Sequence, residues 1–229
     1  MLESLFTQFD SIVVLDLETT GLDPRTDEII EFGALRITPD GPEAEDDVLI
    51  RLSDGNRLPP AITKLTGITE DRLFYEGIEK AEAAARIRAM LSVPNTLIAT
   101  YNAQFDLCFL YYFLREYGGL ELLQAAQLYD VLTVYRDRRD YPHRLENAVA
   151  AYALETQNTH RAIDDARATL ELLAAMEDEQ DDLSSYIDLF GYNPRYGAPR
   201  PRISSVTYRA QPYERSIPLY ERDRDTVPG

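Results

Sequence analysis

The sequence contains few cysteines and lysines and no long apolar run. Cys108 is the single cysteine among 229 residues, which excludes an internal disulfide and a zinc site built from several cysteines. No apolar stretch approaches the roughly 20 residues that a membrane-spanning helix needs. The first ten residues lack the basic and apolar segments of a secretory signal. We therefore expect a cytoplasmic protein, in a reducing compartment, without a membrane partner.

Positive charge is scarce and unevenly distributed. The formal net charge is -17, and Lys64 and Lys80 are the only lysines. Residues 191–229 hold seven Arg and four acidic residues, a net charge of +3, so the rest of the chain carries about -20. A broad electrostatic footprint on nucleic acid is therefore not expected. Any contact with a polyanion must depend on local chemistry, with divalent cations supplying positive charge.

The order of apolar patterns predicts an α/β domain. Alternating or continuous apolar residues predict strands at 11–20, 27–38, 47–52, 96–101 and within 125–132. Helical periodicity and capping signals predict helices at 59–67, from Thr69 onward, and at 77–91, 103–118, 131–138, 144–154 and 161–178. Asn102 is expected to cap the helix at 103–118. Strands that form a meander and then alternate with helices indicate a mixed sheet flanked by helices.

A change in composition marks the C-terminal part of the chain. We assign residues 1–180 to the domain and residues 181–229 to a helix end followed by a Pro-, Tyr- and Arg-rich tail. The tail has little amphipathic periodicity, so we expect it to be mostly irregular, with a short strand within 202–208. It could wrap the domain, reach a partner or be disordered.

Two carboxylates lie near the end of the first predicted strand. In the segment VVLDLETTG, Asp16 and Glu18 are two residues apart, so they share one face of the strand while Leu15 and Leu17 face the other. Open sheets tend to bind ligands at this end of their strands, and carboxylate oxygens suit Mg²⁺ or Mn²⁺. Two solvated acids on an exposed strand face would produce the same pattern.

Two later segments add two acids and a histidine. In YNAQFD, Asp106 falls in the first turn of a helix, where the helix dipole alone also favours a carboxylate. In HRAIDDA, His160 lies in a loop and Asp165 follows five residues later in a helix. The adjacent Asp164 is rotated by about 100° around the helix axis, so only one of the two acids can face a common site.

DLETTG, YNAQFD and HRAIDDA, in this order and at this separation, resemble the three motifs of the DnaQ-like 3′–5′ exonuclease family. The histidine before the last aspartate marks its DEDDh group. The segment LTGIT at 65–69 is similar to one in the proofreading epsilon subunit of bacterial DNA polymerase III. The resemblance covers roughly residues 10–177. Tyr101 departs from it, because relatives often have His at this position, which is not a metal ligand in the family.

The resemblance implies an RNase H-like five-stranded fold and a hydrolase that releases nucleoside monophosphates from DNA 3′ ends. It implies that Asp16, Glu18, Asp106 and Asp165 hold two Mg²⁺ or Mn²⁺ ions, with Asp16 bridging both, and that His160 is the general base. These roles are chemically consistent, since a bound metal lowers the pKa of water and an imidazole accepts a proton at neutral pH. The implied substrate-binding residues are Leu17, Thr19, Thr66, Asn102 and Phe105.

Three further possibilities remain at the level of sequence. Exoribonucleases of the same fold share the motifs, and no residue of the sequence identifies a sensor of the 2′-hydroxyl group. A non-catalytic docking subunit is disfavoured because the acids and His160 are intact. A replication-protein partner or a homodimer is compatible with the sequence. Residues 185–190, SYIDLF, vaguely resemble the apolar peptides that dock on sliding clamps, but we favour an amphipathic helix end packed on the domain.

Overall fold

A mixed five-stranded sheet forms the centre of the protein. The structure is a computed structural model that describes residues 2–156, 159–212 and 217–222. The strand order is β3-β2-β1-β4-β5, with β1 antiparallel to β2 and parallel to β4. The strands are β1 (Ser11–Thr19), β2 (Ile29–Thr38), β3 (Gly41–Leu49), β4 (Thr96–Thr100) and β5 (Gln127–Asp130). The predicted α/β class with a mixed sheet is confirmed.

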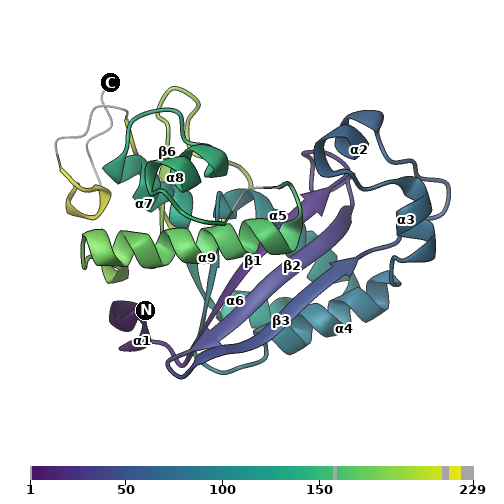
Figure 1. The fold of residues 1–229 in the computed structure, drawn as a ribbon, viewed down its shortest axis with the longest axis horizontal. Helices are drawn as coiled ribbons and strands as arrows, with labels where there is room; N and C mark the ends of the chain where they lie inside the picture. The colour runs from purple at the N-terminus through teal and green to yellow at the C-terminus, as the bar shows by residue number, and fades with distance from the viewer. Residues whose placement is uncertain (1, 157–158, 213–216, 223–229) are drawn as a thin grey trace.

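Helices cover both faces of this sheet. In Figure 1, α9 crosses one face, near α7 and α8, while α4, α5 and α6 lie against the other. The helices are α1 (Glu3–Phe6), α2 (Pro60–Thr66), α3 (Glu70–Tyr75), α4 (Lys80–Leu91), α5 (Ala103–Tyr117), α6 (Leu120–Ala125), α7 (Val131–Arg138), α8 (Leu145–Ala151) and α9 (Ala162–Glu179). Among the described residues, no helix combines the length and the apolar character needed to cross a bilayer.

The alternation of β1 decides which residues reach each face. Ile12 and Val14 are fully buried in a cluster that contains the apolar face of α9. Val13 and Leu15 are fully buried in a second cluster, with α4 and α5. Each such side chain contributes about 1.5–3 kcal/mol of stability when it is fully buried. Since successive strand residues alternate, β1 directs its later even-numbered residues toward the side of the sheet that α9 covers.

Several element boundaries differ from those predicted. The third strand runs from Gly41 to Leu49 rather than from 47 to 52. Its first half is rich in acidic residues, which edge strands tolerate because one side of the strand faces solvent. The helix expected at 77–91 starts at Lys80, because Ile78 forms a bridge with Ile50 instead. The short helices α1 and α6 were not predicted.

The C-terminal segment contains little regular structure but packs against the domain. After α9 come a 3₁₀ turn, η1 (Leu183–Tyr186), and two short parallel strands, β6 (Leu189–Tyr192) and β7 (Thr207–Ala210), and a second turn, η2 (Leu219–Glu221). The strand expected within 202–208 is therefore present, although it begins at Thr207 and ends later than predicted. Residues 213–216 and 223–229 of the predicted tail lie outside the described residues.

The segment SYIDLF does not form an amphipathic helix end. Its residues form the end of η1 and the start of β6, and Leu189 and Phe190 are buried in the two main hydrophobic clusters. Both apolar side chains that a clamp-docking peptide would offer are therefore used inside the fold, and this segment does not support the docking hypothesis.

Candidate active site

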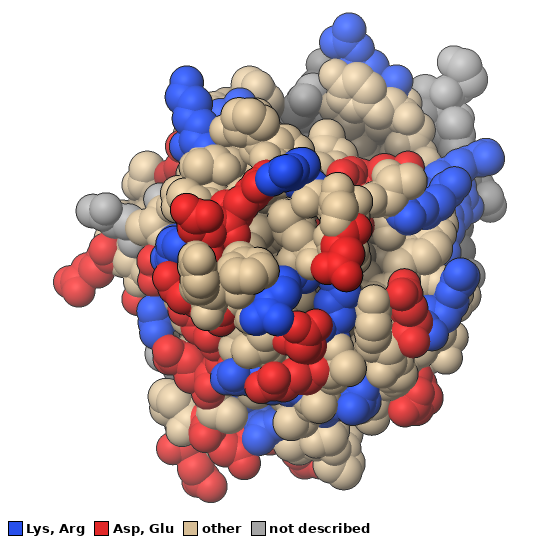
Figure 2. Space-filling model, turned by 90° about the vertical axis from the view of Figure 1, so that its right-hand side faces the viewer, with Lys and Arg blue, Asp and Glu red and all other residues tan. Residues whose placement is uncertain are grey.

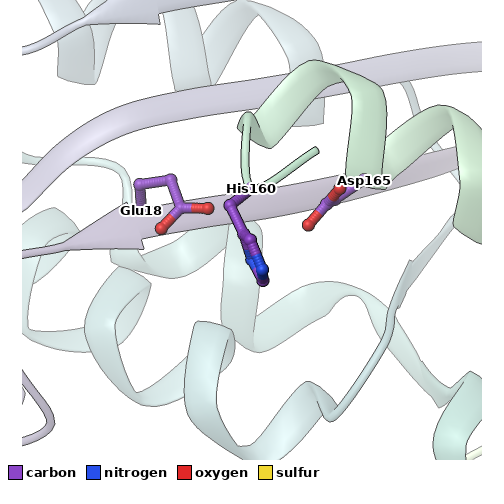
Figure 3. Close-up of side chains that lie close together, drawn as sticks. All are labelled: Glu18, His160 and Asp165. Carbon is purple, nitrogen blue, oxygen red and sulfur yellow. The ribbon is translucent and has the colours of Figure 1, made fainter. Parts of the chain in front are cut away.

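The first and third motifs converge at the C-terminal end of β1. Asp16 and Glu18 continue the face of β1 on which Ile12 and Val14 contact α9. Glu18, His160 and Asp165 each bring a potential ligand atom within 4.8 Å of the other two. Figure 3 shows these three side chains side by side, from β1, from the loop before α9 and from the first turns of α9. A carboxylate, an imidazole and a second carboxylate therefore face one small space.

A glycine on β2 allows α9 to begin close to the sheet. Gly33 pairs with Asp16 across the β1–β2 ladder. A Cβ atom added at Gly33 would lie 2.2 Å from the backbone nitrogen of Ile163 and 2.3 Å from the carbonyl carbon of Ala162. The absence of a side chain thus lets the first turn of α9 rest directly on the strand, which brings Asp165 beside the acids of β1.

Glu31 anchors the same turn of α9 and was not recognised from the sequence. It is fully buried and pairs with Glu18 across the ladder. Its Oε1 accepts hydrogen bonds from Nε and Nη2 of Arg161, at 2.8 and 2.5 Å, and its Oε2 accepts one from the backbone N–H of Ala162 at 3.0 Å. The sequence did contain one indication of this role: Glu31 lies inside the apolar run of a central strand, and a buried acid requires a partner.

Two hydrogen bonds from Thr159 attach the loop that carries His160 to the start of α9. The backbone N–H of Thr159 donates to Oδ1 of Asp165 at 3.1 Å, and the Thr159 hydroxyl donates to Asp164 at 2.7 Å. His160 itself adopts a left-handed conformation, with φ of 56°. Such conformations are uncommon for residues other than glycine and are found at functional sites. The half-buried imidazole is therefore positioned beside Asp165 by its flanking residues.

The second motif enters the site through α5, with a cap that differs from the prediction. Asn102 has φ of 67° and its side chain makes no capping hydrogen bond. Asp130, at the end of β5, instead accepts a hydrogen bond from the backbone N–H of Ala103 at 3.0 Å. Asp106 lies in the first turn, almost completely buried, and accepts a 2.7 Å hydrogen bond from the Thr100 hydroxyl. The capping acid comes from a neighbouring strand, which the local sequence does not reveal.

Burial and mutual repulsion raise the pKa values of the four acids of the site. Burial, followed by the charges of Asp106, Asp165 and Glu18, raises the pKa of Asp16 well above its usual value. Burial and the neighbouring acids Asp165 and Glu31 raise the pKa of Glu18 to about 8. Burial also raises the pKa of Asp106 to about 7 and that of Asp165 to about 6. The site therefore concentrates negative charge that a cation would relieve.

The expected substrate-binding residues have different environments. Leu17 and Thr66 are buried, and the Thr66 hydroxyl donates to the Ile62 carbonyl group. Thr19 ends β1, with its hydroxyl bonded to the carbonyl of Gly21. Asn102 is exposed, while the Phe105 ring is half-buried, with its centroid 4.9 Å from that of Phe109. The exposed amide of Asn102 and the supported ring of Phe105 are accessible to a ligand without rearrangement.

The mixed sheet carries a cluster of carboxylates and one histidine, an arrangement typical of metal-dependent hydrolases. Comparison with known proteins identifies the family. The model of a family described as Exonuclease (RNase_T) matches residues 13–173. The chain belongs to this exonuclease family, which confirms the expected DnaQ-like relationship.

Its relatives include DNA polymerase components. The chain is 34% identical over 166 residues to a PolC-type DNA polymerase III of Thermotoga petrophila, covering 71% of this chain and 11% of the relative. It is 30% identical over 181 residues to the DNA polymerase III subunit epsilon of Treponema pallidum, covering 75% of each. The chain thus spans about a tenth of the PolC-type relatives that it matches.

Solved structures share the fold. Exonuclease I of E. coli in complex with a dT13 oligonucleotide superimposes with a TM-score of 0.71 at 24% identity, over 77% of this chain and 43% of that one. This likeness supports the RNase H-like architecture expected from the sequence.

Proposed function

We propose that this chain is a metal-dependent 3′–5′ exonuclease that releases nucleoside monophosphates from DNA 3′ ends. The observation that carries the proposal is the convergence of Glu18, His160 and Asp165 within 4.8 Å, near the half-buried acid Asp16. DNA is favoured as substrate because the relatives are a DNA polymerase III subunit epsilon and an Exodeoxyribonuclease I. RNA is the alternative substrate.

The donor set fits divalent metal ions. Asp16, Glu18, Asp106 and Asp165 supply carboxylate oxygens, which are the preferred ligands of Mg²⁺ and Mn²⁺. Burial is the main cause of their raised pKa values, and for Asp16 and Glu18 the charges of neighbouring acids add to it. We infer that these four acids hold two Mg²⁺ or Mn²⁺ ions. When bound, such ions lower the pKa of water and stabilise the departing 3′-oxygen of the cleaved bond.

His160 is the proposed general base. Its half-buried imidazole is accessible to water, and an imidazole can accept a proton at neutral pH. Asp165 is close enough for the His160 charge to lower the Asp165 pKa, which opposes the larger effect of burial on that carboxyl. The backbone beside His160 is tied to α9 by hydrogen bonds from Thr159 to Asp165 and Asp164, which favours a fixed position for the loop.

The terminal nucleotide of the substrate strand would contact residues that surround the four acids. We infer that the Phe105 ring, supported by Phe109, stacks on the terminal base. Asn102 offers an exposed amide to the same nucleotide. Leu17, Thr19 and Thr66 complete this proposed contact surface, with Leu17 contributing backbone groups because its side chain is buried.

A pair of neighbouring acids provides the test. Asp165→Asn removes a proposed metal ligand, whereas Asp164→Asn changes an acid that pairs with Arg167 at 3.1 Å and bonds to the Thr159 hydroxyl. Degradation of 5′-labelled single-stranded DNA and RNA, with Mg²⁺ or Mn²⁺, should fall at least about 100-fold in Asp165→Asn and in His160→Ala. Asp164→Asn should stay within about twofold of wild type, because the asparagine oxygen can still accept the hydrogen bond from the Thr159 hydroxyl.

The outcomes separate the candidate functions. Loss of activity on DNA in Asp165→Asn and His160→Ala supports a deoxyribonuclease, and faster loss of RNA than DNA in wild type would favour the exoribonuclease. Equal activity of Asp165→Asn and wild type would contradict the proposed site. A wild type inactive on both substrates would favour a docking subunit.

A further inference from the structure

An arginine-rich pocket lies between α7, the loop that follows it and the C-terminal segment. Its volume is about 450 Å³, and the described residues of its wall include Arg136, Arg139 and Arg144 and one acidic residue, Asp140. The C-terminal segment closes it with Asn193 and Gln211. Such a group of arginines is unusual in a chain of net charge -17.

Among the pockets lined by described residues, the one with Arg115 and Arg202 has basic and no acidic side chains, but it holds fewer arginines. A pocket on α5 and the loop after β1 is lined by three basic and three acidic side chains. On the face shown in Figure 2, basic and acidic side chains are interspersed, so that face has no large field of one sign. A strand of nucleic acid needs cationic contacts beyond the acidic centre, because that centre repels phosphates.

Two of the three arginines are available for a new anion. Nη1 of Arg136 donates to the neutral Gly191 carbonyl at 3.4 Å. Arg144 is largely exposed, and its contact with Glu146, 3.5 Å long, joins two exposed side chains. Such exposed pairs contribute about 0–1 kcal/mol and are easily exchanged. Arg139 is less available to bind an anion, because it already pairs with Glu179 at 2.7 Å.

The pocket is fastened to the second motif. The hydroxyl of Tyr101, the residue before Asn102, donates to the carbonyl of His143 at 2.9 Å. His143 lies edge-on to the ring of Tyr141, at 5.9 Å between centroids. Tyr141 is 72% exposed and offers a face on which a base could stack. The loop 140–144 is therefore attached at the strand end from which α5 carries Asp106 into the site.

We propose that this pocket binds the sugar–phosphate backbone of the substrate strand, a few nucleotides away from the end held by the acids. This inference rests on the proposed function and extends it. Arg136 and Arg144 contact phosphates, for which the planar guanidinium group offers paired donors. Gln211 donates to the Thr133 carbonyl and to Asp137, both at 2.8 Å, and so holds the C-terminal segment as the outer wall.

Three described arginines of the C-terminal segment make contacts within that segment. Arg209 donates two 2.8 Å hydrogen bonds to the carbonyls of Leu219 and Tyr220. Arg195 and Arg202 lie over tyrosine rings. In the proposal, the described part of the tail shapes the pocket, while the charge comes from α7 and the loop that follows it.

Binding of oligothymidylates of two lengths tests the proposal. The full chain and its Arg136→Gln, Arg144→Gln and doubly substituted forms would be titrated, with Ca²⁺ as the divalent ion, against a trinucleotide and an oligomer of about 16 nucleotides. Fluorescence anisotropy over a range of salt concentrations gives affinity and salt dependence. Arg115→Gln is the matched control, since Arg115 is an exposed arginine over the Tyr112 ring at 5.4 Å.

Arg136 and Arg144 should each contribute independently to the affinity for the long oligomer. Each substitution should reduce the slope of log affinity against log salt by about 0.7, and the double substitution by about 1.4. Binding of the trinucleotide should not change. Arg144→Lys should retain the slope, because it retains the charge, and Arg115→Gln should match wild type.

The results distinguish this proposal from the proposed function. If the double variant binds the long oligomer with wild-type affinity and slope, or if Arg115→Gln has an equal effect, the pocket proposal is overturned, whether or not DNA is degraded. If the slope depends on Arg136 and Arg144 but the wild type releases no nucleotide with Mg²⁺ or Mn²⁺, the pocket proposal stands and the exonuclease proposal fails.

Discussion

Without divalent metal, the protein should lose stability as pH rises from about 4.5 to about 8. The pKa of Glu18 is raised from 4.5 to about 8 in the folded protein. Between these values the folded state holds a proton that the unfolded state has released, so the free energy of unfolding falls with rising pH. Asp106 and Asp165, whose pKa values are raised to about 7 and about 6, act in the same direction.

The size of this loss follows from Glu18. A shift of about 3.5 pKa units corresponds to about 5 kcal/mol at 1.36 kcal/mol per unit. Glu18 is only half-buried, and solvent screening reduces this to about 2–3 kcal/mol. For a chain of this length, each kcal/mol shifts the melting temperature by about 2–4 °C. The metal-free melting temperature should therefore fall by about 4–12 °C across the interval.

Calorimetric melting in a chelator, with and without excess Mg²⁺ or Mn²⁺, measures this effect. Metal at 100 times its dissociation constant should add about 2.7 kcal/mol and restore the loss at high pH. Na⁺ at equal ionic strength is the control, and Glu18→Gln should flatten the pH dependence. A metal-free melting temperature that stays constant or rises over the interval, together with no response to Mg²⁺ or Mn²⁺, would refute the clustered-acid reasoning.

Three substitutions test the support of the site. Glu31→Gln removes the charged partner of Arg161, and we expect a destabilisation of about 3–5 kcal/mol in urea unfolding, whereas Glu45→Gln, on an exposed pair, should cost less than about 1 kcal/mol. Equal effects would contradict the anchoring role. Gly33→Ala should cost about 1–3 kcal/mol by displacing the start of α9, and unchanged stability would show that the close approach is not needed. Phe190→Ala should cost about 3–5 kcal/mol, and a loss below about 1 kcal/mol would mean that β6 does not contribute to the core.

Local patterns were sufficient to predict the sheet and the elements that carry the acids. The two-residue period of β1 separates Asp16 and Glu18 from the apolar residues of the other face, as the structure places them. Family resemblance, rather than spacing alone, selected Asp165 over Asp164. The structure pairs Asp164 with Arg167 and places Asp165 beside Glu18.

Interactions between distant segments were not predictable from local sequence. As an acid in a buried strand, Glu31 requires a partner, but the local sequence does not identify that partner as Arg161, 130 residues later. The cap of α5 was assigned to Asn102, the nearest suitable residue, but Asp130 supplies it from the end of another strand. Residues 185–190 were expected to pack on the domain as a helix end, whereas Phe190 enters the core from strand β6. In each case the partner is chosen by tertiary packing, which local propensity does not encode.

The most direct test of the central claim is the first product released from single-stranded DNA. The substrate carries a label on its 3′-terminal nucleotide, and the reaction contains Mg²⁺ or Mn²⁺. The account predicts that the labelled nucleoside 5′-monophosphate appears first, with no longer labelled fragment before it, and that His160→Ala and Asp165→Asn suppress its release. Early release of labelled fragments several nucleotides long, or release that persists in both variants, would contradict a 3′–5′ exonuclease centred on these residues.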